Sequence, residues 1–199
     1  VLVVQISTLG MERLKSVIVE ELTKALRPHC IYEKSDMGVR QEEGLKPSIG
    51  ILAGKMPGEV MIQENNLNFL VDVEKGQKTG FFLDQREMRS LVQNFAKGKN
   101  VLNCFSYTGG FSIAALAGGA THAVSVDISP EAINFAEKNA VKNGFVKKHE
   151  GISADVFLYL RALEKNTHDF IVLDPPAFTK RKTDVVAACR GYKDINGLA

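Results

Sequence analysis

The stretch VLNCFSYTGGF, residues 101–111, decides the fold of the larger part of this chain. An apolar run leads into a turn with two consecutive glycines, Gly109 and Gly110, and a short helical pattern follows. Because glycine has no Cβ, a ligand's adenosyl group can approach the backbone at the carboxyl end of such a strand. A tight turn that binds nothing explains the two glycines equally well at this point.

Strands and helices alternate on both sides of this turn, which is typical of a parallel sheet with crossover helices. Asp84 and Glu87 are expected to open a helix as a capping box, and Gly98 to end it. We then expect strands at 100–105, 122–127, 149–152 and 169–174, and helices up to 117, at 129–143 and at 155–163. Residues 77–199 are therefore predicted to form an α/β domain with a Rossmann-like sheet.

The first part of the chain shows a different pattern, which predicts a small α+β domain at residues 1–76. Its expected elements are a strand at 1–6, an amphipathic helix at 11–26 that Pro28 ends, a further strand, a loop at 34–47, and a hairpin with strands at 59–63 and 67–71. Asn65-Asn66 suits the hairpin turn because asparagine tolerates left-handed backbone. The segment 75–80 contains two glycines and no apolar residue, so we place the domain boundary between residues 76 and 77.

Composition limits the classes of protein to which the chain can belong. Its 199 residues are 45% hydrophobic and 24% charged, which excludes a disordered or collagen-like chain. The apolar runs are far shorter than the roughly 20 residues that span a bilayer, and we expect neither a membrane anchor nor a signal peptide. Three widely spaced cysteines predict no disulfide framework and no metal cluster, and they favour a cytoplasmic location. The net charge of +2 restricts any nucleic-acid surface to a local patch.

Three carboxylates follow the ends of predicted strands. Asp127 lies 18 positions after Gly109, where an acidic residue can bind ribose hydroxyls. The chain lacks a Gly-x-Gly-x-x-Gly turn, which disfavours a dinucleotide and hence a dehydrogenase. Asp155 can reach an adenine amino group or cap a helix, and the sequence leaves both roles open. Two prolines follow Asp174 and present its carboxylate rigidly at the binding edge of the sheet.

Five motifs, in this order, resemble those of the class I S-adenosylmethionine-dependent RNA methyltransferases, and most closely the RlmI-like enzymes that make 5-methylcytosine in 23S ribosomal RNA. They are KTGFFLDQR at 78–86, NCFSYTGG at 103–110, Val126-Asp127, Asp174-Pro175-Pro176 and ACRGYKDIN at 188–196. The resemblance extends over Val1–Ala199. It implies that the family's PUA domain and the last three strands of its sheet are absent from this chain, so the class I methyltransferase sheet is expected to be incomplete at its C-terminus.

The resemblance also implies S-adenosylmethionine as the cosubstrate and assigns residues to its site. The expected cofactor-binding residues are Lys78, Thr79, Gly80, Phe105, Tyr107, Thr108, Gly109, Asp127, Ile128, Asp155, Asp174 and Pro175. The expected target-side residues are Gln85, Arg86, Pro176, Phe178, Lys180, Arg181, Lys182, Arg190 and Lys193. Gln85-Arg86 can equally be a solvated first helical turn, and the basic residues a solvated surface.

For the mechanism, the resemblance implies Asp174 as the catalytic residue, which would accept a hydrogen bond from the target cytosine. The family's nucleophilic cysteine is expected beyond Ala199, so residues 1–199 alone are expected to be inactive. Cys104 and Cys189 are interpreted as structural, because free cysteine is most often a small buried apolar side chain.

Two other functions stay open from the sequence. One is a guanine-N7 ribosomal RNA methyltransferase of the same fold, which needs no nucleophilic cysteine. The other is a noncatalytic RNA-binding or assembly factor that keeps the cosubstrate fold. In each case RNA is the expected partner, most directly 23S ribosomal RNA. We expect no membrane and no metal partner, and a homodimer is left open.

Overall fold

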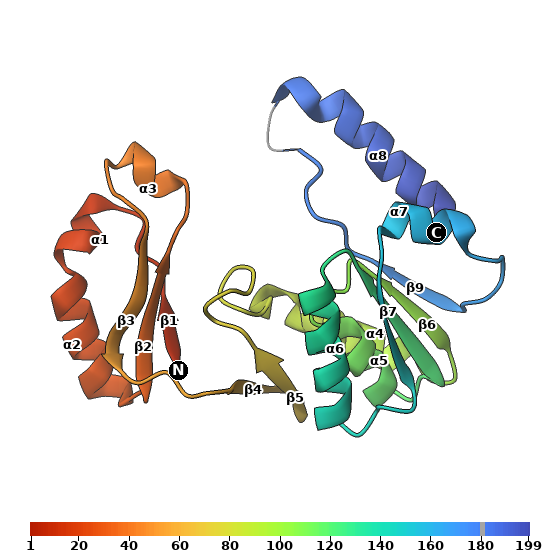
Figure 1. Ribbon diagram of the computed structural model, residues 1–199, viewed down its shortest axis with the longest axis horizontal. Coiled ribbons are helices and arrows are strands. Elements are labelled where there is room, and N and C mark those ends of the chain that lie inside the picture. The colour runs from red at the N-terminus through yellow and green to blue at the C-terminus, as the bar shows by residue number, and fades with distance from the viewer. Residues whose placement is uncertain (180–181) are drawn as a thin grey trace. The chain divides into compact units, whose positions relative to one another are not determined.

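The computed structural model describes residues 1–179 and 182–199, which form two compact units (Figure 1). The first unit contains residues 1–60 and 71–82, and the second contains residues 61–70 and 83–199. The chain therefore enters the second unit twice. The boundary expected between residues 76 and 77 stays a prediction about domains, because compact units need not coincide with folding domains.

A three-stranded sheet is the centre of the first unit. Its strands lie in the order β1-β2-β3, with β1 parallel and β3 antiparallel to β2. The elements are β1 (Leu2–Val4), α1 (Leu9–Arg13), α2 (Lys15–Leu26), β2 (Cys30–Ser35), α3 (Val39–Glu42) and β3 (Ser48–Gly54). β2 is buried along its whole length because it is the middle strand. A small α+β unit is thus present, and β3 is a strand that the sequence pattern did not predict.

The single helix expected at 11–26 is wrong in one respect, because the helix breaks at Leu14. The Leu14 N–H donates to the Met11 carbonyl three residues back, at 3.1 Å, and its ψ of 2° leaves the helical range. The Leu14 side chain is 51% exposed and does not belong to a buried stripe. The second segment ends at Leu26, before Pro28, as expected.

The loop expected at 34–47 is also wrong in part, since the one-turn helix α3 lies within it. Its Arg40 side chain is buried and donates to the carbonyl oxygens of Ile6 and Lys46. It also bonds Glu12 Oε2 at 3.0 Å. A buried guanidinium requires partners of this kind, and they hold the segment in place. These partners are distant in sequence, so the local pattern gave no sign of them.

A four-stranded parallel sheet in the order β8-β7-β6-β9 is the core of the second unit. Its elements are α4 (Arg86–Phe95), β6 (Asn100–Cys104), α5 (Gly110–Ala117), β7 (His122–Asp127), α6 (Pro130–Lys142), β8 (His149–Ser153), α7 (Val156–Ala162), β9 (Phe170–Leu173) and α8 (Val185–Leu198). Successive strand residues face opposite sides: Val101 packs in a cluster with residues of α4 and α5, and Leu102 in one with residues of α7 and α8. The expected Rossmann-like α/β fold is confirmed.

The helices begin in different ways. The capping box expected for Asp84 and Glu87 is wrong, because a 3-10 turn, η1 (Leu83–Gln85), precedes α4 and makes Gln85 its capping residue. Gln85 makes no side-chain capping bond. By contrast, the Ser129 side chain caps α6 and accepts from Ala132 N at 3.2 Å. No helix among residues 1–179 and 182–199 has both the length and the apolar character needed to cross a membrane.

The expected hairpin is formed by β4 (Val60–Glu64) and β5 (Leu67–Val71). Asn65 and Asn66 have φ values of 51° and 63°, the left-handed conformation that the turn requires. Most of the hairpin belongs to the second unit. Residues 61–70 of the hairpin therefore make their contacts within that unit.

A buried ion pair joins β4 to α4. Arg89 Nε donates to Glu64 Oε1 at 2.6 Å, and Arg89 Nη2 donates to Oε2 at 2.8 Å. The two side chains are only 4% and 8% exposed. Beside them, Asn65 Nδ2 donates to Ser90 Oγ at 2.9 Å. The strand is thereby attached to the helix by a two-point, charge-assisted contact.

A chain of polar side chains crosses the parallel sheet from β6 to β8. Asn103 Nδ2 donates to Ser112 Oγ at 3.0 Å, and the Ser112 and Ser125 hydroxyls bond at 2.6 Å. Ser125 Oγ in turn bonds His149 Nε2 at 2.8 Å. Burial, and to a lesser extent the charge of His122, lower the pKa of His149 to about 4. The imidazole is therefore neutral at pH 7.

We expect His149→Asn to remove part of the pH dependence of stability. Histidine in an unfolded chain titrates near pH 6.5. Because the folded protein binds the proton more weakly, His149 contributes stability above that pH and loses it as the pH falls from 6.5 towards 4. We therefore compare the free energies of unfolding of the wild type and the variant. Their difference should fall by up to about 3 kcal/mol as the pH falls from 6.5 towards 4, since one pKa unit corresponds to about 1.4 kcal/mol. Urea unfolding at several pH values measures this, and equal pH slopes in both proteins would contradict it.

Candidate active site

The turn after β6 holds three left-handed residues within five positions. Phe105, Tyr107 and Gly109 have φ values of 56°, 47° and 77°. Such values are uncommon for residues with a side chain and often mark functional sites. A Cβ on Gly109 would lie 2.8 Å from the Cβ of Ala136 on α6, so only glycine fits there. The turn thus has a fixed shape at the carboxyl edge of the sheet.

Asp127 lies at the same edge, at the end of β7, and its carboxylate holds the turn. Oδ2 accepts from Tyr107 N at 2.8 Å, and Oδ1 accepts from Ser129 N at 2.9 Å. A carboxylate can accept about four hydrogen bonds, so both oxygens retain capacity for the hydroxyls of a ribose. Ile128, the next residue, is 71% exposed and offers an apolar surface. This combination fits the expected adenosyl ligand.

The remaining residues of the turn are largely buried. The Ser106 hydroxyl is buried without a hydrogen-bond partner among the described residues, which is costly unless a ligand or water supplies one. Thr108 is buried too, so its backbone is the part that can shape a ligand site. Phe105 packs against the apolar cluster of α7 and α8. The turn therefore combines an anchored backbone with one unsatisfied polar group.

Asp155 has the structural role that the sequence left open. It is the N-cap of α7, and its Oδ1 accepts from Leu158 N at 3.0 Å. This bond fixes the carboxylate at the carboxyl end of β8. A contact with the adenine amino group stays a prediction.

Lys78, Thr79 and Gly80 belong to the first unit and are positioned by contacts within it. Gly80 has a φ of 98°, and a Cβ there would lie 2.7 Å from the Asp72 carbonyl oxygen. Lys78 Nζ lies 4.4 Å from the centroid of the Phe82 ring. The role of these three residues in cofactor binding stays a prediction.

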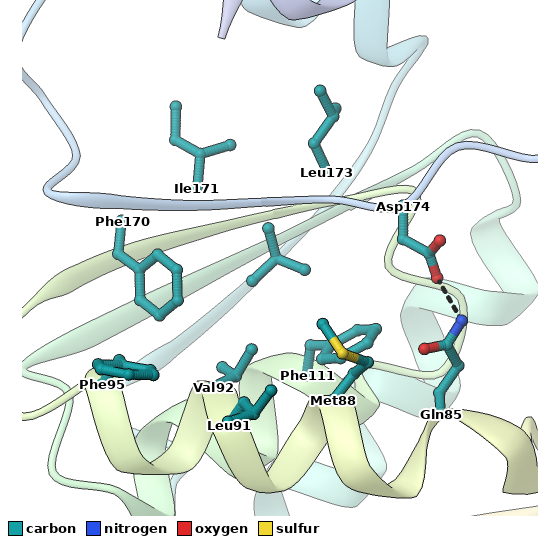
Figure 2. A pocket seen from close by; sticks show the side chains of 11 residues that line it. Gln85, Met88, Leu91, Val92, Phe95, Phe111, Phe170, Ile171, Leu173 and Asp174 are labelled. Carbon is teal, nitrogen blue, oxygen red and sulfur yellow. Dashed lines mark hydrogen bonds between the residues drawn. The ribbon is translucent and has the colours of Figure 1, made fainter.

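Asp174 directly follows β9 and is exposed, with Pro175 and Pro176 after it. Gln85 Nε2 donates to Asp174 Oδ2 at 3.4 Å (Figure 2). The structure therefore brings together Gln85, which was expected on the target side, and Asp174, which was expected to be the catalytic residue. Arg86 directly follows Gln85 in the sequence and is exposed at the start of α4. Its role on the target side stays a prediction.

Gln85 and Asp174 lie at one end of an apolar groove of about 390 Å³ between α4 and β9 (Figure 2). Figure 2 shows Phe170 pointing towards α4, whereas Ile171 and Leu173 point to the other side of the strand. The rest of the groove is lined by Met88, Leu91, Val92, Phe95, Phe111 and Val172. Met88, Leu91, Val92 and Phe95 are spaced three or four residues apart and share one face of α4.

Helix α8 supports the segment that follows Asp174. The Phe178 and Tyr192 rings have centroids 4.4 Å apart, and the Phe178 and Phe157 centroids are 5.8 Å apart. Tyr192 Oη donates to the Pro176 carbonyl and accepts from Phe178 N, both at 3.4 Å. Tyr192 was part of a family motif but not an expected site residue. Its partners lie 14 and 16 residues earlier, beyond the reach of a local pattern.

The structure describes part of the expected basic surface. Arg190 and Lys193 are exposed on α8. Lys182 begins the 3-10 helix η2 (Lys182–Asp184). Lys180 and Arg181 lie outside the described residues. Contact of this surface with RNA stays a prediction.

The cysteines differ in their surroundings. Cys30 and Cys104 are buried, and burial raises the pKa of Cys104 to about 12. A thiol with that pKa stays protonated at pH 7, which favours the structural interpretation of Cys104. The expectation of a buried side chain is wrong for Cys189, which is exposed because Ala188 and Ile195 form the buried face of α8. Among the described residues, no group of three or more His, Cys, Asp or Glu could hold a metal ion.

The parallel sheet, the anchored glycine turn and the carboxylate after the next strand define a Rossmann-like enzyme of the kind that binds an adenosyl cosubstrate. The chain belongs to the S-adenosylmethionine-dependent methyltransferase family, whose model matches residues 39–195. S-adenosylmethionine, the expected cosubstrate, is the methyl donor on which this family depends.

Individual relatives confirm the resemblance to the RlmI-like enzymes. The chain is 48% identical over 203 residues to the ribosomal RNA large subunit methyltransferase I of Aeromonas salmonicida, and 47% identical over 202 residues to that of Aliivibrio fischeri. These alignments cover 100% and 99% of this chain and 51% of each relative, so the chain spans about half the length of the curated relatives it matches. A putative methyltransferase solved in complex with SAH has a TM-score of 0.77 and 29% identity, over 97% of this chain and 52% of that one.

Proposed function

We propose that this chain is part of an enzyme that methylates large-subunit ribosomal RNA, with carbon 5 of a cytosine in 23S ribosomal RNA as the target atom. The observation that carries the proposal is the similarity, over the whole of this chain, to proteins named ribosomal RNA large subunit methyltransferase I. The cosubstrate supplies an electrophilic methyl group. The turn at 105–109 and Asp127 hold its adenosyl end.

Asp174 is the proposed catalytic residue. Its exposed carboxylate can accept a hydrogen bond from the amino group or the protonated ring nitrogen of cytosine. That bond stabilises the charge which develops on the base as the reaction proceeds. Gln85 orients the carboxylate through its bond to Oδ2.

Methylation at carbon 5 of cytosine also requires a thiolate that adds to carbon 6. Cys104 does not suit this role, because its pKa of about 12 keeps the thiol protonated. Cys30 is buried and belongs to the first unit. Cys189 is exposed on α8, but the resemblance to the RlmI-like enzymes implies a nucleophile beyond Ala199 and not at this position. On that resemblance we assign the nucleophile to a residue outside 1–199, and we expect residues 1–199 alone to bind the cosubstrate without methylating RNA.

The methylated nucleoside tests this proposal. The full-length protein is incubated with unmodified large-subunit ribosomal RNA and isotopically labelled S-adenosylmethionine, and the RNA is digested for mass spectrometry. We expect labelled 5-methylcytidine, and at least about a hundredfold slower transfer by Asp174→Asn. Detection of labelled 7-methylguanosine instead would contradict the cytosine assignment and identify guanine as the target base. Cosubstrate binding without any transfer would favour the noncatalytic RNA-binding factor.

The exposed basic residues of α8 are expected to contact RNA phosphates. Replacing Arg190 and Lys193 with alanine should weaken RNA binding and lower the slope of log affinity against log salt by about 1.4 to 1.8, because each lost phosphate contact removes about 0.7 to 0.9. Filter binding at several salt concentrations measures the slope. Lys147→Ala with Lys148→Ala is the matched control, since these exposed lysines lie outside α8 and directly precede the amino end of β8. Equal slopes for the two double variants would contradict the expectation.

A further inference from the structure

Asn139 is a polar residue at a fully buried position of α6. It has no exposed surface, and its buried neighbours on the helix are apolar: Ala132, Ile133, Ala136 and Ala140. A buried amide is costly unless its hydrogen bonds are made. Asn139 uses both ends: Oδ1 accepts from Leu70 N at 2.7 Å, and Nδ2 donates to the Thr108 carbonyl at 3.0 Å. It therefore joins β5 of the hairpin to the glycine turn.

Asn143, one helical turn later, makes a related set of contacts. Its Oδ1 accepts from Asn68 N at 2.9 Å, and its Nδ2 donates to the Asn68 carbonyl at 2.7 Å. Four residues of α-helix rise about 6 Å, and two residues of β-strand extend about 6.6 Å. The two amides thus match the spacing of Asn68 and Leu70 along β5. Side chains of α6 therefore make hydrogen bonds to backbone groups of β5 that a neighbouring strand would otherwise make.

Only one of the two amides reaches the turn. The peptide unit between Thr108 and Gly109 is held at both of its polar atoms: Asn139 binds the Thr108 carbonyl, and Gly109 N donates to the Ser106 carbonyl at 2.9 Å. One helical turn before Asn139, Ala136 lies against Gly109. Asn143 contacts Asn68 and the Asn139 carbonyl. The two asparagines thus share the hairpin contact and differ in the turn contact.

We propose that Asn139 is a positioning residue for the cosubstrate: it fixes the orientation of the Thr108–Gly109 peptide and couples that peptide to the hairpin. The proposal rests on the assignment of the turn to S-adenosylmethionine binding. Without the amide, this peptide can rotate, and the backbone that faces the adenosyl group loses its shape. Binding of the cosubstrate then includes the cost of ordering the turn.

A matched pair of variants tests the proposal in the full-length protein. Asn139→Ala and Asn143→Ala each remove two hydrogen bonds to the backbone of other segments, and calorimetry measures the affinity for S-adenosylmethionine. We expect at least a tenfold loss of affinity in Asn139→Ala and less than a threefold loss in Asn143→Ala, with similar decreases in Tm. In steady-state kinetics the KM for the cosubstrate should rise in Asn139→Ala more than kcat falls. Equal losses of affinity in the two variants, or none in Asn139→Ala, would overturn the proposal.

Asn139→Asp keeps the test decisive if Asn139→Ala does not fold. A carboxylate at this position still accepts from Leu70 N but repels the Thr108 carbonyl oxygen, whereas a protonated carboxyl can donate to it. Affinity relative to the wild type should therefore be lower at pH 8.5 than at pH 5.5. A pH-independent ratio would overturn the proposal. If the wild type itself does not bind S-adenosylmethionine, the site assignment fails, whereas normal wild-type binding with unaffected Asn139 variants contradicts only this inference.

Discussion

Asp127→Ala is expected to lower the affinity for S-adenosylmethionine at least tenfold, which corresponds to about 1.4 kcal/mol. The Asp127 carboxylate has two tasks in the structure. It holds the Tyr107 N–H at 2.8 Å, and it retains acceptor capacity for ribose hydroxyls. Charge-assisted hydrogen bonds of this kind contribute about 1.5–3 kcal/mol each. Titration calorimetry on the full-length protein measures the change.

Asp169→Ala is the matched control for this prediction. Its carboxylate also accepts a backbone N–H, that of Asn100 at 2.9 Å, but at the amino edge of the same sheet. Both variants should therefore be destabilised by the loss of such a bond, whereas only Asp127→Ala should lose cosubstrate affinity. Unchanged affinity in Asp127→Ala, or equal losses in both, would remove Asp127 from the cosubstrate site.

Glu64→Ala is expected to lower the free energy of unfolding by about 3–5 kcal/mol, the usual cost of removing one partner from a buried ion pair. The loss arises because the Arg89 guanidinium is left buried without its counter-charge, and α4 loses its attachment to β4. Chemical denaturation measures this change. The double variant Glu64→Leu with Arg89→Met should recover most of the stability, since apolar residues can replace a buried pair at little cost.

The exposed ion pair between Arg161 and Asp194 is the control that tests whether burial causes the large loss of stability expected for Glu64→Ala. These side chains are 47% and 48% exposed, and surface pairs contribute at most about 1 kcal/mol. Asp194→Asn should therefore lower stability by no more than that amount. A similar small loss in Glu64→Ala would mean that the hairpin is not fastened through this pair.

Local sequence patterns predicted most of the second unit because its elements are specified by neighbouring residues. β7 occurs at 122–127, as its apolar run predicted, and Ser129-Pro130 begins α6. The errors occur where tertiary contacts override local preference. The segment 34–47 contains a helical turn because a buried Arg40 holds it to distant carbonyls, and no pattern within the segment carries that information.

The sequence could place the acidic and glycine residues of the candidate site at one edge of the sheet, but it could not reveal the contacts that support them. Asp127, Gly109 and Asp174 stand at strand ends, where their positions in the sequence already place them at one edge of a parallel sheet. Asn139 was overlooked because an asparagine in a helix usually faces solvent, and its partners Thr108 and Leu70 lie 31 and 69 residues earlier. Burial of the Asn139 amide could be recognised only from the folded chain.

The attachment of the hairpin by two helices has a consequence for synthesis on the ribosome. Leu70 emerges 69 residues before Asn139, the residue that accepts its N–H. At the usual translation rate of about 5–20 residues per second, Asn139 is synthesised roughly 3 to 14 s after Leu70. During this time the Leu70 N–H lacks the acceptor that it has in the folded protein. An unpaired strand edge can pair with another nascent chain during such an interval. Slow translation between the hairpin and α6 would prolong this exposure, so we expect codon usage across residues 71–139 to affect the yield of correctly folded protein.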